Sequence, residues 1–214
     1  MNRPRWALAY GLGLLLAGAV SGLLILTPFT RSFDAAWREA MLATRNDALT
    51  AVSHALNLAG GPASLVITLA LLAWWLATGR RWGALFLFAT VLATTVLTQG
   101  VKHLVLRPRP ADPMVTVDTG SFPSGHVVTT VALCLVVVAV MVSTRLRAGL
   151  VTTAVVTLLM IWDRTYVSAH WFSDTIGGAL LGGGTTLVLW WGFAPLLEKD
   201  NLRRLAKQQV KPLT

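Results

Sequence analysis

Long apolar runs separated by short polar segments make up most of the 214-residue chain. An α-helix needs about 20 mainly apolar residues to cross the hydrocarbon core of a bilayer, and six runs are near that length. With approximate bounds, these runs cover residues 6–29, 56–76, 82–101, 125–143, 150–167 and 171–196. The pattern therefore predicts an all-α polytopic membrane protein with six transmembrane helices, forming a single domain over residues 1–214.

The first run follows Arg3 and Arg5, an arrangement found both in membrane spans and in secretory signal peptides. The apolar region of a signal peptide covers only about 7–15 residues, and the run over residues 6–29 is longer. We therefore expect a span that is retained in the mature protein. Cleavage as a signal peptide is the alternative.

The segment between the first two runs has an amphipathic pattern. Residues 30–50 mix acidic and basic side chains, while Phe33, Trp37 and Met41 recur four residues apart. This interval places the three side chains on one face of a helix. We expect a short helix that lies in the membrane interface, and a solvated loop is the alternative that the pattern leaves open.

Composition agrees with a membrane protein and gives the helices a direction. Hydrophobic residues make up 55% of the chain and charged residues 13%, whereas soluble domains carry about 25% charged residues. With six spans, 11 of the 18 Lys and Arg residues fall on the side of the termini, including the turns at Arg80 and Arg145. Basic residues favour the cytoplasm. We therefore expect both termini to be cytoplasmic, and the net charge of +9 to reflect this topology rather than nucleic-acid binding.

Three polar clusters lie at the ends of apolar runs, and the six-span topology places all of them at the outer face. They are residues 102–110 (KHLVLRPRP), 123–126 (PSGH) and 164–174 (RTYVSAHWFSD). An ionised side chain in the membrane costs about 2.5–3.5 kcal/mol on insertion scales, so these groups require partners or a function.

The clusters carry more positive than negative charge. Lys102, Arg109 and Arg164 face one motif carboxylate, Asp174, so the missing partner is an anion. Phosphate fits best, because the arginine fork matches its oxygens in bidentate fashion. We expect the ligand of these clusters to carry such a group.

The second and third clusters contain residues suited to phosphate chemistry. Ser124 is a candidate N-cap and Gly125 allows close backbone approach at a helix start, where free N–H groups bind anions. His170 and Asp174 are four residues apart and so share a helical face. A carboxylate that orients one imidazole nitrogen leaves the other free to attack, and His126 could protonate the leaving oxygen.

Together the clusters resemble the three-part signature of the type 2 phosphatidic acid phosphatase superfamily. That signature is lysine, six residues, Arg-Pro; then Pro-Ser-Gly-His; then Ser-Arg, five residues, His, three residues, Asp. The matching residues are Lys102, Arg109 and Pro110; Pro123, Ser124, Gly125 and His126; and Arg164, His170 and Asp174. Asp163 stands where the family usually has serine, and such an acid could weaken phosphate binding or pair with Arg164 or Arg107.

The resemblance implies a membrane lipid phosphatase that needs no metal or other cofactor. His170 would attack phosphorus to form a phosphohistidine, Asp174 would orient it, and His126 would protonate the leaving group and then activate water. Lys102, Arg109, Ser124, Gly125 and Arg164 would hold the phosphate. The substrate would be a membrane lipid phosphate or diphosphate, with undecaprenyl pyrophosphate, phosphatidylglycerophosphate, phosphatidic acid and diacylglycerol pyrophosphate as candidates.

Other functions stay open on the sequence alone. A lipid-to-lipid phosphotransferase would share the site, and a phospholipid-binding or transport protein would use it without catalysis. Vanadate-dependent haloperoxidases are soluble proteins with a similar anion site. The six predicted spans argue against this function. A metal site could use the five acidic and histidine residues expected at the outer face, but their spacing is unlike that of zinc ligands. They are His103, His126, Asp163, His170 and Asp174.

Some nearby polar residues lie outside the signature. We expect His103 and Arg107 to be solvated loop residues, with a contact to the lipid headgroup as the alternative, and Asp112 and Asp118 to be solvated rather than paired acids. We also expect the small pair Gly178 and Gly182 to let two helices of the same chain approach closely, with a dimer face as the alternative.

Overall fold

The computed structural model describes residues 3–141 and 146–209, and for residues 204–209 only the backbone. Eight α-helices and no strand occur in this part of the chain, which confirms the all-α prediction. The helices are α1 (Arg5–Leu24), α2 (Pro28–Ala43), α3 (Asp47–Gly60), α4 (Pro62–Ala77), α5 (Arg81–Val105), α6 (Gly125–Met141), α7 (Leu146–Tyr166) and α8 (Phe172–Gln209). The predicted turn residue Arg145, the predicted span end at residue 143 and the tail residue Lys211 lie outside the described residues.

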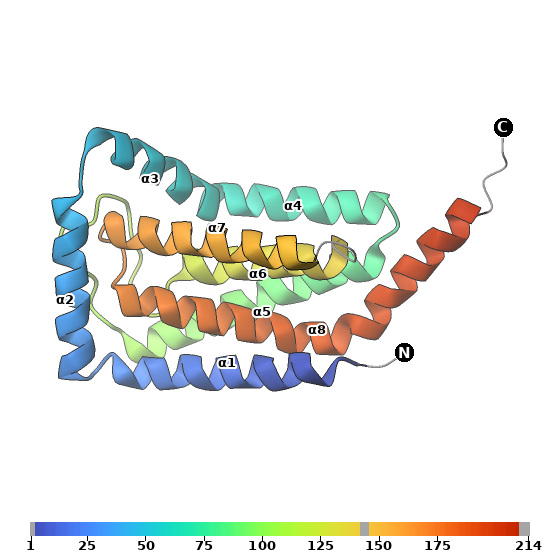
Figure 1. The fold of residues 1–214 in the computed structure, drawn as a ribbon, viewed down its shortest axis with the longest axis horizontal. Helices are drawn as coiled ribbons and strands as arrows, with labels where there is room; N and C mark the ends of the chain where they lie inside the picture. Colours follow the sequence, from blue (N-terminus) through green and yellow to red (C-terminus); the bar gives the residue numbers. More distant parts are fainter. Residues whose placement is uncertain (1–2, 142–145, 210–214) are drawn as a thin grey trace.

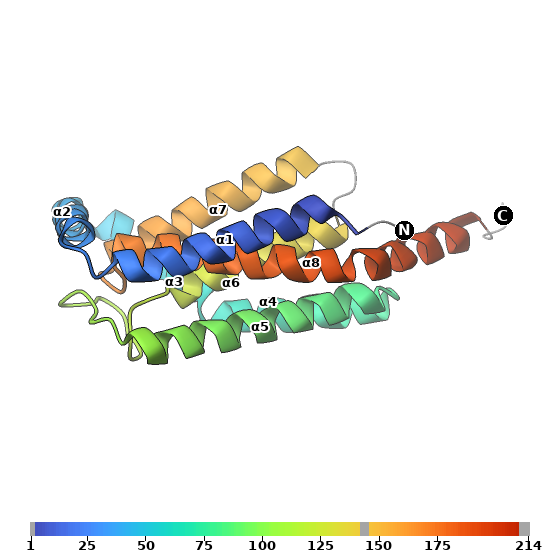
Figure 2. The same cartoon turned by 90° about the horizontal axis from the view of Figure 1, so that it is seen from below.

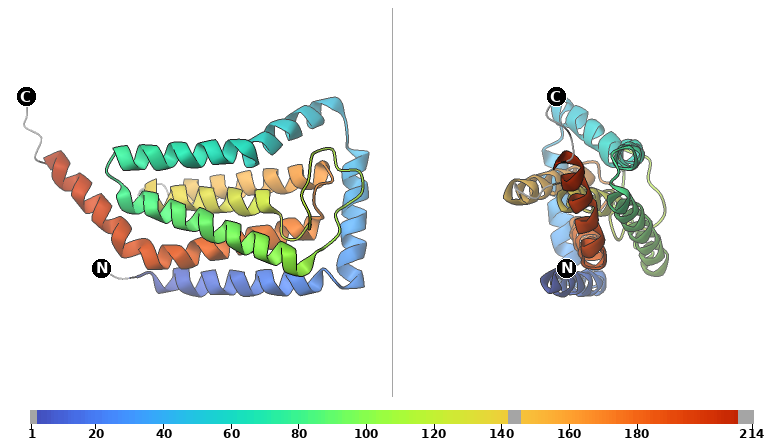
Figure 3. Two further views of the ribbon diagram at one scale, coloured as in Figure 1. Left: turned by 180° about the vertical axis from the view of Figure 1, so that it is seen from behind. Right: turned by 90° about the vertical axis from the view of Figure 1, so that its right-hand side faces the viewer.

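The long helices run side by side, and α2 crosses one end of the bundle (Figure 1). Viewed from below, α1 and α8 lie along each other, with α4 and α5 on one side of them and α7 on the other (Figure 2). The described chain ends lie at the end of the bundle opposite α2, and the 106–124 loop lies at the α2 end (Figure 3). The three polar clusters therefore meet at one end of the molecule, as the alternation of spans predicted.

The number of helices that can cross a membrane differs from the prediction of six. Four helices, α1, α5, α7 and α8, are long and apolar enough, and α3 with α4 forms a fifth candidate that is bent by 43°. This chain is a membrane protein on that evidence. The sixth predicted span corresponds to α6, which has only 17 residues and so a length of about 26 Å at 1.5 Å per residue.

The short length of α6 has a visible cause. Figure 1 shows that α6 begins deeper in the bundle than the neighbouring end of α7, because the 106–124 loop enters the bundle before the helix starts. The hydrocarbon core is about 30 Å thick, so loop and helix together are needed for this segment to cross it. The six-span topology stays a prediction.

The predicted span over residues 56–76 lies within the bent pair of α3 and α4, and the helix is broken at Gly61. Asn46 caps α3 by accepting a hydrogen bond from the Leu49 N–H at 3.0 Å, so this helix starts well before residue 56. Pro62 occupies the first turn of α4, where its missing N–H costs nothing. Gly61 between them has non-helical backbone angles (φ −98°, ψ −115°).

The amphipathic segment forms a helix rather than a solvated loop. Its aromatic face packs on the first residue of α8: the Phe172 ring lies 5.5 Å from the Phe33 ring and 4.5 Å from the Trp37 ring, centroid to centroid. This contact fixes α2 across the end of the bundle where α8 begins.

Close packing of α8 against α6 confirms the prediction for the small pair. A Cβ at Gly178 would lie 2.8 Å from the Ser124 carbonyl oxygen, and one at Gly182 would lie 2.7 Å from the Val128 carbonyl oxygen. Only glycine permits these approaches. They hold the Pro-Ser-Gly-His segment directly on the helix that carries Asp174.

Candidate active site

A pocket of about 280 Å³ lies at the end of the bundle where the polar clusters meet. Its walls come from the end of α5, the 106–124 loop, the start of α6, the end of α7 and the turn before α8. Six of the predicted site residues line it: Lys102, Arg109, Gly125, His126, Arg164 and His170. The other two, Ser124 and Asp174, are fully buried and contact this group from behind, as described below.

The Pro-Ser-Gly-His segment is held by α8 at the floor of the site. The Ser124 N–H donates to the Asp174 carbonyl oxygen at 3.0 Å, and the Ser124 carbonyl oxygen accepts from the Val128 N–H at 3.0 Å, as at the start of a helix. The Ser124 hydroxyl was predicted to cap α6, yet it is buried and makes no hydrogen bond among the described residues.

His170 is buried and has a defined orientation. Its Nδ1 lies 2.7 Å from the Ser121 carbonyl oxygen, and its Nε2 lies 3.2 Å from an Arg109 guanidinium nitrogen. A carbonyl can only accept, so Nδ1 carries the proton and Nε2 presents its lone pair. Burial lowers the pKa of His170, and although Asp174 opposes this, the cations Arg109 and Lys102 reinforce it. The neutral imidazole is therefore the stable form at pH 7.

Asp174 lies close to His170 but is not its nearest acceptor. Its Oδ2 is 3.7 Å from Nδ1, beyond hydrogen-bond distance, and the Ser121 carbonyl takes the bond that was expected for the carboxylate. Both carboxylate oxygens are engaged elsewhere: Oδ2 accepts from the Trp171 N–H at 2.9 Å, and Oδ1 accepts from Arg107. Asp174 thus acts on the imidazole through its charge at short range.

Arg107 was expected in a solvated loop, and this prediction is wrong. The side chain is only 10% exposed and pairs with two buried carboxylates, those of Asp34 and Asp174. Its partner Asp34 comes from α2, far from Arg107 in the sequence, so no local pattern could indicate the pair.

Arg164 is buried and fixed by its neighbours. Its Nη1 donates to the Asn57 side-chain oxygen at 2.9 Å, and its Nε lies 3.0 Å from an Asp163 carboxylate oxygen. The other Asp163 oxygen accepts from the Ser53 hydroxyl. Of the two partners expected for Asp163, the structure selects Arg164, because Arg107 is engaged by other acids.

Three residues of the signature have buried polar atoms with no hydrogen-bond partner among the described residues. These atoms are the Ser124 hydroxyl, His126 Nε2, and Nε and Nη2 of Arg164, of which Nε lies beside the Asp163 carboxylate. Leaving a buried polar group unpaired costs about 1–3 kcal/mol, and here such atoms occur together in the signature. Their residues supply two donors and an imidazole, as binding of a phosphoryl group with proton transfer requires.

Asp118 is exposed, as expected, with 56% of its side chain accessible, and its carboxylate also pairs with the cations of the pocket. Its carboxylate accepts from Lys102 Nζ at 2.8 and 3.0 Å and pairs with Arg109. Partial burial favours the neutral acid, but the hydrogen bond and charge of Lys102, with Arg109, outweigh it and lower the pKa of Asp118. Two negatively charged oxygens therefore already bind where the sequence predicts phosphate oxygens.

Comparison with known proteins assigns the family. The family model of the PAP2 superfamily matches residues 82–197, which is more than half of the chain. The chain belongs to the PAP2 superfamily. The match contains every residue of the signature, from Lys102 to Asp174.

Two solved structures resemble this PAP2 protein. The first transmembrane PAP2 type phosphatidylglycerolphosphate phosphatase from Bacillus subtilis aligns with a TM-score of 0.76 at 22% identity, over 95% of this chain and 98% of that chain. Aquifex aeolicus LpxE aligns with a TM-score of 0.61 at 20% identity, over 71% of this chain and 91% of that chain. Both share the fold. A search of curated proteins found no match.

Several site contacts come from outside the PAP2 match, and the sequence did not reveal them. Asp34, Ser53 and Asn57 precede residue 82, yet they bind Arg107, Asp163 and Arg164. Asp34 follows directly after Phe33, which belongs to the aromatic face of α2. A carboxylate directly beside the aromatic face of an amphipathic helix is the one signal that could have marked it.

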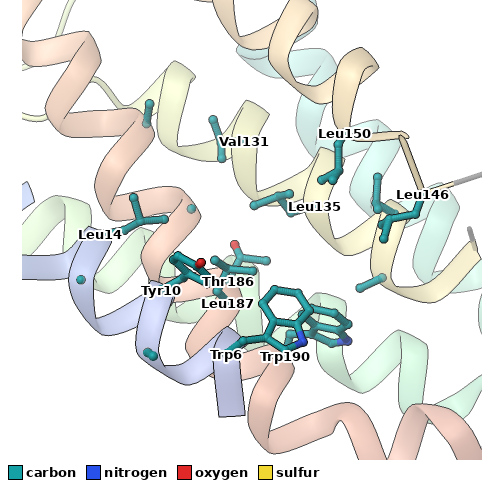
Figure 4. A pocket seen from close by; sticks show the side chains of 16 residues that line it. Trp6, Tyr10, Leu14, Val131, Leu135, Leu146, Leu150, Thr186, Leu187 and Trp190 are labelled. Carbon is teal, nitrogen blue, oxygen red and sulfur yellow. The ribbon is translucent and has the colours of Figure 1, made fainter. Parts of the chain in front are cut away.

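A second cavity is chemically unlike the PAP2 site. It has a volume of about 780 Å³ and lies between α1, α6, α7 and α8, and Figure 4 shows Trp6, Tyr10, Leu135 and Trp190 around it. No charged residue lines it. In the described residues, no group of three or more His, Cys, Asp or Glu side chains is arranged to hold a metal ion. His103, which was considered as a metal ligand, is exposed and does not line the pocket formed by the polar clusters.

Proposed function

We propose that this PAP2 protein is an integral membrane phosphatase that hydrolyses a lipid phosphate or diphosphate through a phosphohistidine intermediate. One observation carries the proposal: the unprotonated Nε2 of His170 lies at a pocket that His126 and Arg164 also line, and each of these two residues has an unpaired buried polar atom. A nucleophile and unpaired phosphate ligands at one place are the requirements for phosphoryl transfer.

In the first step the lone pair of His170 Nε2 attacks phosphorus, and the bond from phosphorus to the lipid oxygen breaks. His126 gives its proton to that oxygen, so the lipid leaves as an alcohol, or as a monophosphate if the substrate is a diphosphate. The phosphoryl group remains on His170. The Ser121 carbonyl keeps the proton on Nδ1 in place, and the Asp174 carboxylate stabilises the positive charge that develops on the ring.

In the second step water attacks the phosphoryl group and transfers a proton to His126. The bond between phosphorus and His170 Nε2 breaks, inorganic phosphate leaves, and both histidines return to their starting forms. Lys102, Arg109 and Arg164 stabilise the charge on the phosphoryl oxygens in both transition states, with the Ser124 hydroxyl and the Gly125 N–H as further donors. Such preorganised charges supply much of the catalysis in many enzymes.

Substrate binding requires an exchange of anions in the pocket. Lys102 and Arg109 are paired with Asp118, which lies on the exposed 106–124 loop. The substrate phosphate replaces this carboxylate on the two cations. Because one anion leaves as another arrives, the buried cations remain paired throughout.

The position of the pocket favours a lipid substrate. It lies at the ends of membrane helices, and the start of α6 is recessed into the bundle, so a headgroup can reach it from the outer leaflet. We infer from the distribution of basic residues that both termini are cytoplasmic and that the site faces the outside of the cell membrane.

A substrate panel tests the proposal. The full chain, purified in detergent, is expected to release inorganic phosphate from at least one lipid phosphate or diphosphate, and His170→Ala is expected to reduce the rate by at least about 10³-fold. EDTA should change the rate by less than about twofold, because cationic side chains stabilise the charge. Three results would contradict the proposal. The first is transfer of phosphate to a second lipid without release, and the second is near-normal turnover by His170→Ala. The third is a loss of activity in EDTA that Mg²⁺ restores.

A further inference from the structure

A buried series of ionic contacts connects helix α2 to Asp174. The Asp34 side chain is 1% exposed, and its Oδ2 accepts from Arg107 Nη2 at 2.7 Å and from the Ser173 hydroxyl at 2.6 Å. Its Oδ1 accepts from the Ser173 N–H at 2.9 Å. Asp34 therefore binds both the 106–124 loop and the first turn of α8.

Arg107 makes the second half of the connection. Its Nη1 donates to Asp174 Oδ1 and to the Ser173 hydroxyl, the latter at 2.8 Å. The guanidinium thus lies between two carboxylates that are each 0–1% exposed. Removing one partner from such a buried group leaves an uncompensated charge, so the three charges form a unit.

The unit determines where the Asp174 carboxylate lies. Arg107 holds Oδ1 and the Trp171 N–H holds Oδ2, and together they leave Oδ2 at 3.7 Å from His170 Nδ1. Without Arg107 only the Trp171 contact would restrain the carboxylate. The distance that sets its electrostatic effect on the imidazole would then no longer be fixed.

Charge balance explains why Asp34 is needed as well. Arg107 next to Asp174 would on its own reduce the negative potential at His170. The negative charge of Asp34 offsets the positive charge of Arg107. Asp174 therefore keeps its electrostatic effect on the ring, while Arg107 keeps the Asp174 carboxylate in place.

We propose that Asp34 and Arg107 are positioning residues for phosphoryl transfer, acting through Asp174. This inference rests on the proposed phosphatase function. Asp34 lies outside the region matched by the PAP2 family model, so a helix that crosses the end of the bundle contributes to the active site of this chain. The aromatic contacts of α2 with Phe172 hold it there.

A double-mutant cycle on the full chain in detergent tests the inference, with kcat and KM measured by phosphate release. Arg107→Gln is expected to lower kcat about 10- to 100-fold, the usual effect of losing a group that orients another, with KM changed less than threefold. Asp34→Asn should lower kcat less. The double variant D34N/R107Q, which restores the wild-type net charge of −1 for the three positions, should recover part of the kcat lost in Arg107→Gln.

The Asp174→Asn background separates positioning from a general structural role. If Arg107 acts through Asp174, then Arg107→Gln lowers kcat less than about twofold when Asp174 is already replaced. If its effect is the same in both backgrounds, the inference is wrong. Should Arg107→Gln not fold, as judged by thermal unfolding, Asp34→Asn serves in the same cycle.

Arg38→Gln is the matched control. Arg38 also joins α2 to the 106–124 loop, through the Ala111 carbonyl oxygen at 3.1 Å, but this bond does not reach Asp174. We expect its kcat to stay within about twofold of wild type. An equal loss of kcat in Arg38→Gln would show that any α2–loop contact matters and would overturn the inference.

An inactive wild type would refute the proposed function and this inference together. An active wild type with unaffected variants would refute the inference alone.

Discussion

At the scale of single residues, burial decides which form of each side chain the site contains. His170 is buried and lines the pocket, and among the described residues its near hydrogen-bond acceptor is the Ser121 carbonyl oxygen. A carbonyl fixes the tautomer as firmly as a carboxylate does, and Asp174 still acts on the ring through its charge. Nε2, the nitrogen that we propose as the nucleophile, is thus unprotonated and lies beside Arg109.

This environment has a measurable consequence for titration. Burial lowers the pKa of His170 below the ordinary value of about 6.5, so the ring is mostly neutral at pH 6.5 and accepts a proton only in more acidic solution. The same shift favours unfolding as the pH falls, because the unfolded chain binds that proton first. NMR titration of the histidines in detergent can test this, since the chain has only four of them and His170→Ala identifies the signal. A midpoint above pH 6.5 would contradict the description of the site.

The sequence predicts the residues of the site far better than their partners. Residue type and spacing identify Lys102, His126 and His170, because the chemistry requires those groups. The partners of Arg107 and Asp118 depend on which helix ends meet in space, and charged residues in a loop are normally solvated. For that reason the burial of Arg107 was not predicted, and neither was the pairing of Asp118 with two cations, although Asp118 is exposed as expected.

At the scale of elements, the break between α3 and α4 shapes the environment of His126. The backbone of Gly61 lies against the imidazole: a Cβ there would be 3.1 Å from His126 Nε2 and 2.8 Å from the Asn57 carbonyl oxygen. The apolar run predicted one span here, although Gly60, Gly61 and Pro62 stand within it. Periodicity indicates how far an apolar run extends, but it does not indicate whether the helix continues through glycine and proline.

The contact predicts a catalytic effect of a small substitution. Gly61→Ala should displace His126 or the end of α3, and we expect kcat to fall about tenfold, since small misplacements of reacting groups are costly. Gly192→Ala in α8 is the control, because a Cβ at Gly192 meets nothing within 4 Å, and its kcat should not change. Phosphate release by both purified variants measures the difference, and equal kcat values for Gly61→Ala and wild type would contradict the contact.

At the scale of the whole molecule, the alternating helices bring distant residues to one end of the bundle. The all-α class and the gathering of three motifs at one end could be predicted, because both follow from the order of apolar runs. The recessed start of α6 and the contribution of α2 could not, since each depends on how the loop at residues 106–124 packs into the bundle. The active site that we propose is consequently larger than the signature, because it includes Asp34 and Asn57 from the first quarter or so of the chain.

The central claim is that these elements meet around one phosphoryl group, which is transferred to His170. Rapid quenching of the full chain during turnover of a phosphate-labelled lipid, followed by digestion under neutral or basic conditions and mass spectrometry, tests it most directly. We predict a phosphoryl group on the peptide that contains His170, and none on that peptide in His170→Ala. A phosphoryl group on another residue, or turnover with no phosphorylated peptide at any time, would contradict the account.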